Sequence, residues 1–91
     1  MAHLAKHNDA LLARVRRIAG QMSAIERALT TGDDCTTTLH LVAGVRGAIN
    51  GLMAEIIREH VREHVVHPGL TDADRQIGAD ELMEVIRRYG K

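Results

Sequence analysis

The segment VAGVRGAINGLMAEIIREH, residues 42 to 60, carries a regular helical pattern of apolar residues. Apolar residues recur in it every three or four positions, as they do on one face of an α-helix: Val42, Val45, Ile49, Leu52 and Ile56. Pro68 and Gly69 end the pattern. The sequence therefore predicts a long helix from about residue 35 to about residue 66.

An earlier helix is predicted because six apolar residues follow the same spacing: Leu11, Val15, Ile18, Met22, Ile25 and Leu29. Thr31 and Gly32 end this helix, since glycine readily adopts the left-handed backbone that closes a helix. Asp33 or Asp34 then caps the next helix. Because the connection is short, the two helices are expected to lie antiparallel as a hairpin.

A polar connector begins at Thr71, and five residues after it predict a short third helix: Leu82, Met83, Val85, Ile86 and Tyr89. No segment shows the alternation of a β-strand, and no internal repeat is present. We therefore expect an all-α protein with one domain over residues 1–91, built as an antiparallel helical hairpin plus a short third helix.

Composition narrows the possible classes of function. The 91 residues are 45% apolar and carry a formal charge of zero, as in a soluble globular protein. The single cysteine, Cys35, excludes an intrachain disulfide and suits a reducing cytosol. No signal peptide or membrane span is recognisable, so we expect a cytoplasmic protein with no membrane partner. The near absence of aromatic residues argues against base stacking on single strands or RNA.

The long helix is apolar over more of its circumference than one neighbouring helix can cover. Ordering a chain costs roughly 1.5 kcal/mol per residue, so a lone hairpin is marginally stable. We expect two copies to pack antiparallel through this helix into a four-helix dimer core. The crossing point falls near four small residues whose size suits close approach: Gly44, Gly47, Ala48 and Gly51.

Three histidines lie close together in EHVREHVVH, residues 59 to 67: His60, His64 and His67. On a helix, all three imidazoles project from one face. Cys35 is 25 residues before His60, or roughly 38 Å along a helix, so the two cannot share a site within one chain. The antiparallel dimer places Cys35 of one chain opposite residues 60 to 64 of the other, and the hairpin brings His3 beside residue 62.

The predicted metal site therefore combines Cys35 of one chain with His60, His64 and His3 of the other. One thiolate with several imidazoles suits Ni(II), Co(II) or Zn(II). Ala2 is small enough for Met1 to be removed, which frees an amine beside His3 as a further nitrogen ligand. His67 is a further possible ligand, although a histidine in the last turn of a helix can simply complement the helix C-terminus.

The same segment contains His-Val-Arg-Glu-His, a match to the inverted zinc-protease pattern H-x-x-E-H. A protease needs a further ligand on another element and a cleft for its substrate, and a helical hairpin of this size provides little room for either. A zinc-dependent hydrolase and a plain metal-buffering helical protein stay open as alternatives of another class. The expected protein is not an enzyme.

Positive charge is concentrated in the first 32 residues, which carry five basic residues against two acidic ones. Arg14, Arg17 and Gln21 lie on one stripe of the first helix beside its apolar seam, and Arg16 flanks the stripe. A charged stripe is usually a solvated face. Here it lies apart from the thiol and imidazole groups, which is the layout of a sensor with separate input and output surfaces.

Three segments resemble the CsoR/RcnR family of bacterial metal-sensing repressors over nearly the whole chain: ARVRRIAGQMSAIERAL at 13–29, the lone Cys35, and VAGVRGAINGLMAEIIREH at 42–60. The resemblance implies an all-helical dimer of dimers that binds operator DNA without a helix-turn-helix and releases it when an inducer binds. The residues expected to contact DNA are then Arg14, Arg16, Arg17 and Gln21, with Arg46 and Lys6 as weaker candidates.

A few positions distinguish the subtypes of this family. Copper sensors carry a second cysteine where this chain has His64, and persulfide sensors also need a second cysteine. Formaldehyde sensors resemble the chain at Cys35 and His60, but they carry proline at the position of Ala2 and typically no histidine matching His64. The chain looks most similar to nickel/cobalt sensors, with His3 included in the match. We expect Ni(II) or Co(II) to be the inducer that derepresses a metal exporter, with formaldehyde as the alternative.

Overall fold

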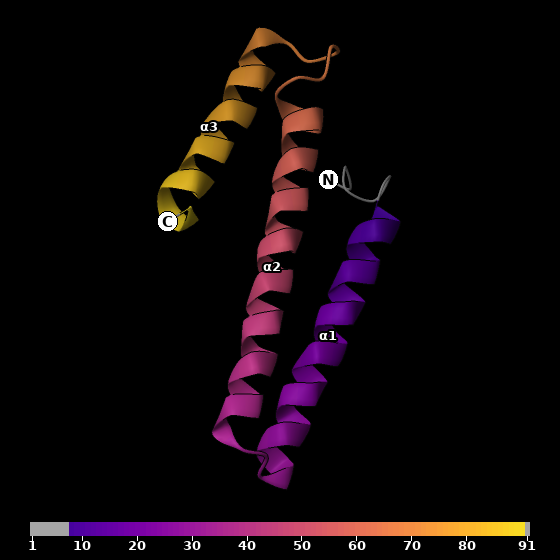
Figure 1. Cartoon of the computed structure of the whole chain (residues 1–91). Coiled ribbons are helices and arrows are strands. Elements are labelled where there is room, and N and C mark those ends of the chain that lie inside the picture. Colours follow the sequence, from indigo (N-terminus) through magenta and orange to yellow (C-terminus); the bar gives the residue numbers. More distant parts are fainter. Residues whose placement is uncertain (1–7, 91) are drawn as a thin grey trace.

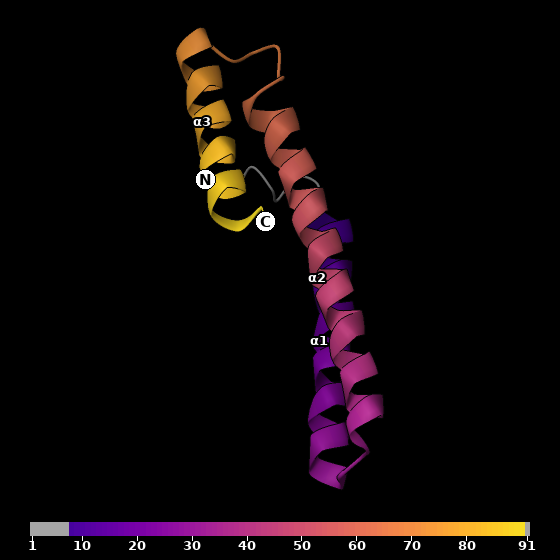
Figure 2. The same ribbon diagram turned by 60° about the vertical axis from the view of Figure 1, so that its left-hand side comes forward.

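The computed structural model describes residues 8–90, which form three helices and no strand (Figure 1): α1 at Asn8–Thr31, α2 at Cys35–His64 and α3 at Asp72–Tyr89. α1 and α2 run antiparallel side by side. α3 folds back along the C-terminal part of α2 (Figure 2), and α1 and α3 each pack against α2 (Figure 1). The predicted all-α hairpin with a third helix is confirmed.

The turn between α1 and α2 has the predicted chemistry. Gly32 adopts a left-handed backbone with φ +77°, and the N–H groups of Gly32 and Asp33 both donate to the Ala28 carbonyl. The Asp34 carboxylate accepts a hydrogen bond of 2.7 Å from the Thr37 N–H, so Asp34 is the N-cap of α2. This bond favours the charged carboxylate and lowers the pKa of Asp34 below its ordinary value of 3.8.

α2 ends at His64, slightly earlier than expected, and the chain then turns toward α3. The Arg75 guanidinium donates to the Val65 carbonyl and, at 3.4 Å, to the Leu70 carbonyl. The last carbonyls of a helix have no partner within the helix. Arg75 therefore stabilises the α2–α3 corner from the first turn of α3.

α3 is longer than predicted, because the segment expected to be a polar connector is helical from Asp72 onward. The Thr71 hydroxyl accepts a hydrogen bond of 3.0 Å from the Asp74 N–H, and acidic residues in the first turn complement the helix dipole. Gly78 lies where α3 crosses α2, because a Cβ at this position would lie 2.0 Å from the His64 carbonyl oxygen. The absence of a side chain permits this close approach.

The molecule is thin, with extents of 55 × 28 × 15 Å, and Ala28 and Val45 are its only buried apolar residues within the part described. Two apolar stripes with heptad spacing stay open to solvent: Val15, Met22 and Leu29 on α1, and Val42, Ile49 and Ile56 on α2. Their exposed fractions range from 38% to 69%. None of the helices within residues 8–90 has an apolar run long enough to cross a bilayer.

Candidate functional site

His60 and His64 lie one turn apart on α2, and their ring centroids are 4.9 Å apart. The predicted pairing of these two imidazoles on one helix face is confirmed. The His60 Nε2 atom lies 2.8 Å from the Gly78 carbonyl oxygen, and only a protonated Nε2 can donate to a carbonyl. In the neutral imidazole, the lone pair is then on Nδ1, which is the atom able to bind a metal ion.

Helix α3 forms the other wall around His60. A pocket of about 200 Å³ between α2 and α3 is lined by the His60 ring, the Glu81 carboxylate and apolar side chains. A Glu81 carboxylate oxygen lies 4.0 Å from His60 Nε2. Gly78 and Glu81 were not predicted as neighbours of the histidines, because they belong to the segment that was expected to be a connector in front of the third helix.

Cys35 is exposed and is the first residue of α2. It lies at the opposite end of the 30-residue helix from His60 and His64. Within residues 8–90, no group of three or more His, Cys, Asp or Glu side chains is close enough to hold a metal ion. Ala2, His3 and Lys6 lie outside the described residues. Joining Cys35 to the histidine pair thus still requires a second chain.

The donor chemistry of the predicted set fits a first-row divalent ion. His60 presents Nδ1 from a half-buried position, and His64 lies beside it on the same helix face. Two imidazoles one helical turn apart are spaced to share one ion, and a thiolate adds the softer ligand that Co(II), Ni(II) and Zn(II) accept.

His67 does not belong to this helix face. It lies in the turn after α2, and its Nδ1 atom accepts a hydrogen bond of 3.0 Å from the Gly69 N–H. The prediction that all three imidazoles project from one helix face is wrong for His67, because α2 ends at His64. Its role as a possible ligand would require Nε2.

A second hollow of about 480 Å³ lies between α1 and α2 and carries three carboxylates on one stripe of α2: Glu55, Glu59 and Glu63. Glu59 is only 7% exposed, and its carboxylate accepts a hydrogen bond of 2.8 Å from Arg62. This bond raises the pKa of the Arg62 guanidinium. Sequence reasoning missed this stripe, although glutamates at every fourth position were a visible signal.

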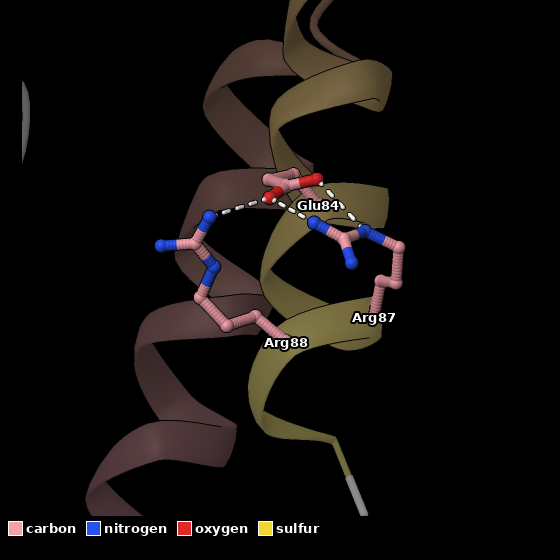
Figure 3. Close-up of polar contacts among 3 residues, drawn as sticks. All are labelled: Glu84, Arg87 and Arg88. Carbon is pink, nitrogen blue, oxygen red and sulfur yellow. Dashed lines mark hydrogen bonds and ion pairs between the residues drawn. The ribbon is translucent and has the colours of Figure 1, made fainter.

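The arginines fall into two groups. Those in the C-terminal half of the chain have partners: Arg58 pairs with Glu55, Arg62 with Glu59, Arg75 with backbone carbonyls, and Arg87 and Arg88 with Glu84 (Figure 3). The others make no hydrogen bond or ion pair through their guanidinium groups within residues 8–90: Arg14, Arg16, Arg17, Arg27 and Arg46. Among the described arginines, those without a partner are thus confined to α1 and the first half of α2.

The residues expected to contact DNA differ in their exposure. Arg16, Arg17 and Arg46 are exposed. Arg14 and Gln21 are half-buried and lie against α2, and the Gln21 Oε1 atom is buried without a hydrogen-bond partner in the described part of the chain. Of the stripe predicted on α1, Arg14 and Gln21 therefore lie along the seam between α1 and α2, whereas Arg17 is exposed.

Comparison with known proteins gives one consistent result. The sequence model of the protein family described as metal-sensitive transcriptional repressors matches residues 7–88 of this chain. The transcriptional repressors RcnR of Salmonella arizonae and of Escherichia coli K12 are 37% and 36% identical over the full length of both chains. A Serratia marcescens protein described only as uncharacterised, from the region 5′ of bioA, is 47% identical over the full length of both.

A solved structure gives the same answer for the fold. It is a variant of the formaldehyde-responsive regulator FrmR from Salmonella enterica serovar Typhimurium in which histidine replaces a glutamate. It superimposes with a TM-score of 0.84 at 41% identity, covering 90% of this chain and 92% of that chain. On these grounds the chain belongs to the metal-sensitive transcriptional repressors of the CsoR/RcnR family, a family of regulators and not of enzymes.

Proposed function

We propose that this chain is a cytoplasmic repressor that binds operator DNA in its metal-free form and releases it when Ni(II) or Co(II) binds. The observation that carries the proposal is the separation of two surfaces on one hairpin. Unpaired arginines collect on α1 and the first half of α2, whereas the paired imidazoles of His60 and His64 lie at the far end of α2. Zn(II) is a further candidate ion.

Residues 1–91 form a single domain in this proposal, and two copies have to associate for the function. The exposed apolar stripes of α1 and α2 support this association. Val42, Ile49 and Ile56 on α2 are all more than a third exposed in one chain. Packing α2 antiparallel against its counterpart covers them and forms a four-helix dimer core, from which a dimer of dimers assembles. The same packing brings Cys35 of one chain to the histidines of the other.

The proposed metal ligands are Cys35 of one protomer with His60, His64 and His3 of the other, and the amine freed at Ala2 adds a nitrogen. His67 stays a possible additional ligand through Nε2. His60 donates its Nε2–H to the Gly78 carbonyl, which keeps Nδ1 unprotonated for the metal. When bound, the ion supplies a link between the N-terminal arm, the end of α2 and the start of α2 in the partner.

On the output side, Arg14, Arg16, Arg17 and Gln21 are the proposed DNA contacts, with Arg46 and Lys6 as supporting charges. Guanidinium groups without protein partners keep their donors for phosphates and guanine edges. Because each neutralised phosphate releases counterions, operator affinity is expected to fall steeply with salt concentration. By linkage, an ion that weakens DNA binding binds less tightly to the DNA complex, and a coupling of about 1 to 3 kcal/mol is enough to derepress an exporter gene.

Formaldehyde is the second candidate inducer, and the similarity to the formaldehyde-responsive regulator favours it. The Cys35 thiolate and the N-terminal amine would then be the reacting groups. Ala2 and His64 argue for the metal instead. The hydrolase and the metal-buffering protein are not proposed, because the chain belongs to a family of repressors.

The deciding experiment is a gel shift of the protein with DNA from the promoter region of its own gene, in the presence of Ni(II), Co(II), Zn(II) or formaldehyde. Release by Ni(II) or Co(II) that requires His64 and Cys35 supports the proposal. Release by formaldehyde but by none of the metal ions would show that formaldehyde is the inducer. Absence of specific binding by the metal-free protein contradicts both.

A further inference from the structure

Gly51 of α2 lies beneath the guanidinium group of Arg14. A Cβ at Gly51 would be 3.1 Å from the Arg14 Nη1 atom, closer than ordinary van der Waals contact. One heptad earlier, a Cβ at Gly44 would lie 3.8 Å from the Gln21 Nε2 atom, an ordinary contact. The two polar side chains of α1 are themselves one heptad apart, so each meets a glycine of α2.

Gly47 provides the contrast within the same helix. Nothing lies within 4 Å of a Cβ at Gly47, so its missing side chain serves no contact in the described chain. It is two residues from Ile49, which at 100° per residue places it on the far side of α2 from the exposed apolar stripe. The predicted role of Gly44, Gly47 and Gly51 as small residues for α2–α2 packing therefore needs revision, since Gly44 and Gly51 face α1 and Gly47 lies away from the exposed apolar stripe.

Arg14 combines two properties that rarely occur together. It is half-buried against α2 and lines the groove that also contains Glu55 and Glu59. Its guanidinium nevertheless makes no hydrogen bond or ion pair within residues 8–90. Packing against α2 is therefore the contact that Arg14 makes within residues 8–90, and its five N–H donors are left for an external acceptor.

We propose that Gly51 is a positioning residue for DNA binding. Because Gly51 has no side chain, the Arg14 guanidinium can lie against α2, and this position sets the direction in which its donors point. The inference rests on the proposed function, in which Arg14 contacts the operator. Bidentate recognition by arginine depends on this direction, because its fork of donors matches phosphate or guanine only in a narrow range of geometry. Gly44 is not assigned this role, because a Cβ there would make only an ordinary contact with Gln21.

The test is Gly51→Ala, with Gly47→Ala as the matched control. The atom that a new Cβ meets is the end of a flexible side chain, so the hairpin keeps its fold and Arg14 moves. Alanine favours a helix over glycine, so both variants should melt at a higher temperature than the wild type. Operator affinity, measured by fluorescence anisotropy, should fall about three- to tenfold for Gly51→Ala, a part of what losing an arginine contact costs. It should be unchanged for Gly47→Ala.

A double-mutant cycle with Arg14→Ala separates this inference from the proposed function. If Gly51 acts through Arg14, Gly51→Ala has no further effect on operator affinity in the Arg14→Ala background. Equal losses in both backgrounds, or wild-type affinity of Gly51→Ala while Arg14→Ala weakens binding, overturn the inference alone. If Arg14→Ala binds the operator with wild-type affinity, then Arg14 does not contact the DNA, and the proposed function is wrong at this residue. Cobalt affinity and solution mass should match the wild type in Gly51→Ala, and a change in either means that the substitution disturbs the assembly instead.

Discussion

Individual hydrogen bonds determine where the helices begin and which ring nitrogen of His60 is available to bind a metal ion. The pairing of His60 with His64 was predictable, because four residues make one helical turn. The tautomer of His60 was not, since the carbonyl that sets it belongs to Gly78, 18 residues further along the chain. The position of His67 was mispredicted because helix ends depend on local caps that periodicity does not report.

Asp34→Ala should lower the melting temperature at neutral pH, because the carboxylate that accepts the Thr37 N–H at the start of α2 is lost. The pKa of Asp34 is depressed in the folded protein, so its contribution is present above pH 3.8 and lost as the pH falls through the folded pKa. Thermal melts from pH 7 to pH 2.5 should therefore converge for variant and wild type. Asp33→Ala serves as control, and a difference that persists at the lowest pH contradicts this account.

Gly78→Ala should destabilise the protein by about 1 to 3 kcal/mol, the usual cost of forcing extra atoms into a packed contact. The new Cβ would lie 2.0 Å from the His64 carbonyl oxygen, and that atom belongs to the helix backbone and cannot rotate away. Denaturant titration measures the loss. Gly47→Ala, which meets open space, should instead gain stability. Equal stability of the two variants would mean that α3 does not cross α2 at Gly78.

At the scale of elements, the predictable parts are those with uninterrupted heptads. α1 and α2 were both expected because their apolar residues repeat over several turns. The turn between them carries a glycine and two candidate capping aspartates, of which the structure selects Asp34. α3 was underestimated because its first two turns are polar. Thr71 and Asp74 form a cap that was visible in the sequence, yet capping signals carry less weight than apolar periodicity. The α2–α3 corner depends on Arg75, which no local pattern indicates.

Arg75→Ala should loosen the attachment of α3 without disturbing the hairpin of α1 and α2. The guanidinium donates hydrogen bonds to the carbonyls of Val65 and Leu70, and the substitution removes these bonds from the corner between α2 and α3. Hydrogen exchange should show reduced protection in residues 72–89 and unchanged protection in α1. Arg88→Ala, which removes an exposed ion pair with Glu84 within α3, is the control and should leave exchange unchanged. Uniform loss of protection along the chain would contradict a local role.

At the level of the whole molecule, one chain leaves its apolar stripes uncovered and its predicted metal ligands far apart. A body only 15 Å thick cannot bury its apolar residues, and the site chemistry is divided between the two ends of α2. The sequence alone predicted both features, since they follow from the width of the apolar face and from the 25 residues between Cys35 and His60. Within the described chain, neither Cys35 nor a third ligand joins the histidine pair.

Ile49→Glu should disrupt self-association, because it places a charge in the middle of the exposed apolar stripe of α2. Sedimentation should show a lower mass than the wild type, and operator affinity should fall with it. Ala54→Glu, on the opposite side of α2 and exposed, is the control. A wild-type mass for Ile49→Glu would place the interface on another surface.

The most direct test of a metal site shared between two chains is complementation with Co(II). A Cys35→Ala chain and a His60→Ala, His64→Ala chain each lack part of every site in their own dimers, but a mixed dimer regenerates one complete site. We predict that the thiolate-to-Co(II) charge-transfer band, absent from either variant alone, appears after the two are unfolded together, refolded and titrated without oxygen. A mixture that stays without the band, while the wild type shows it, would contradict the shared site and with it the proposed route from metal to DNA.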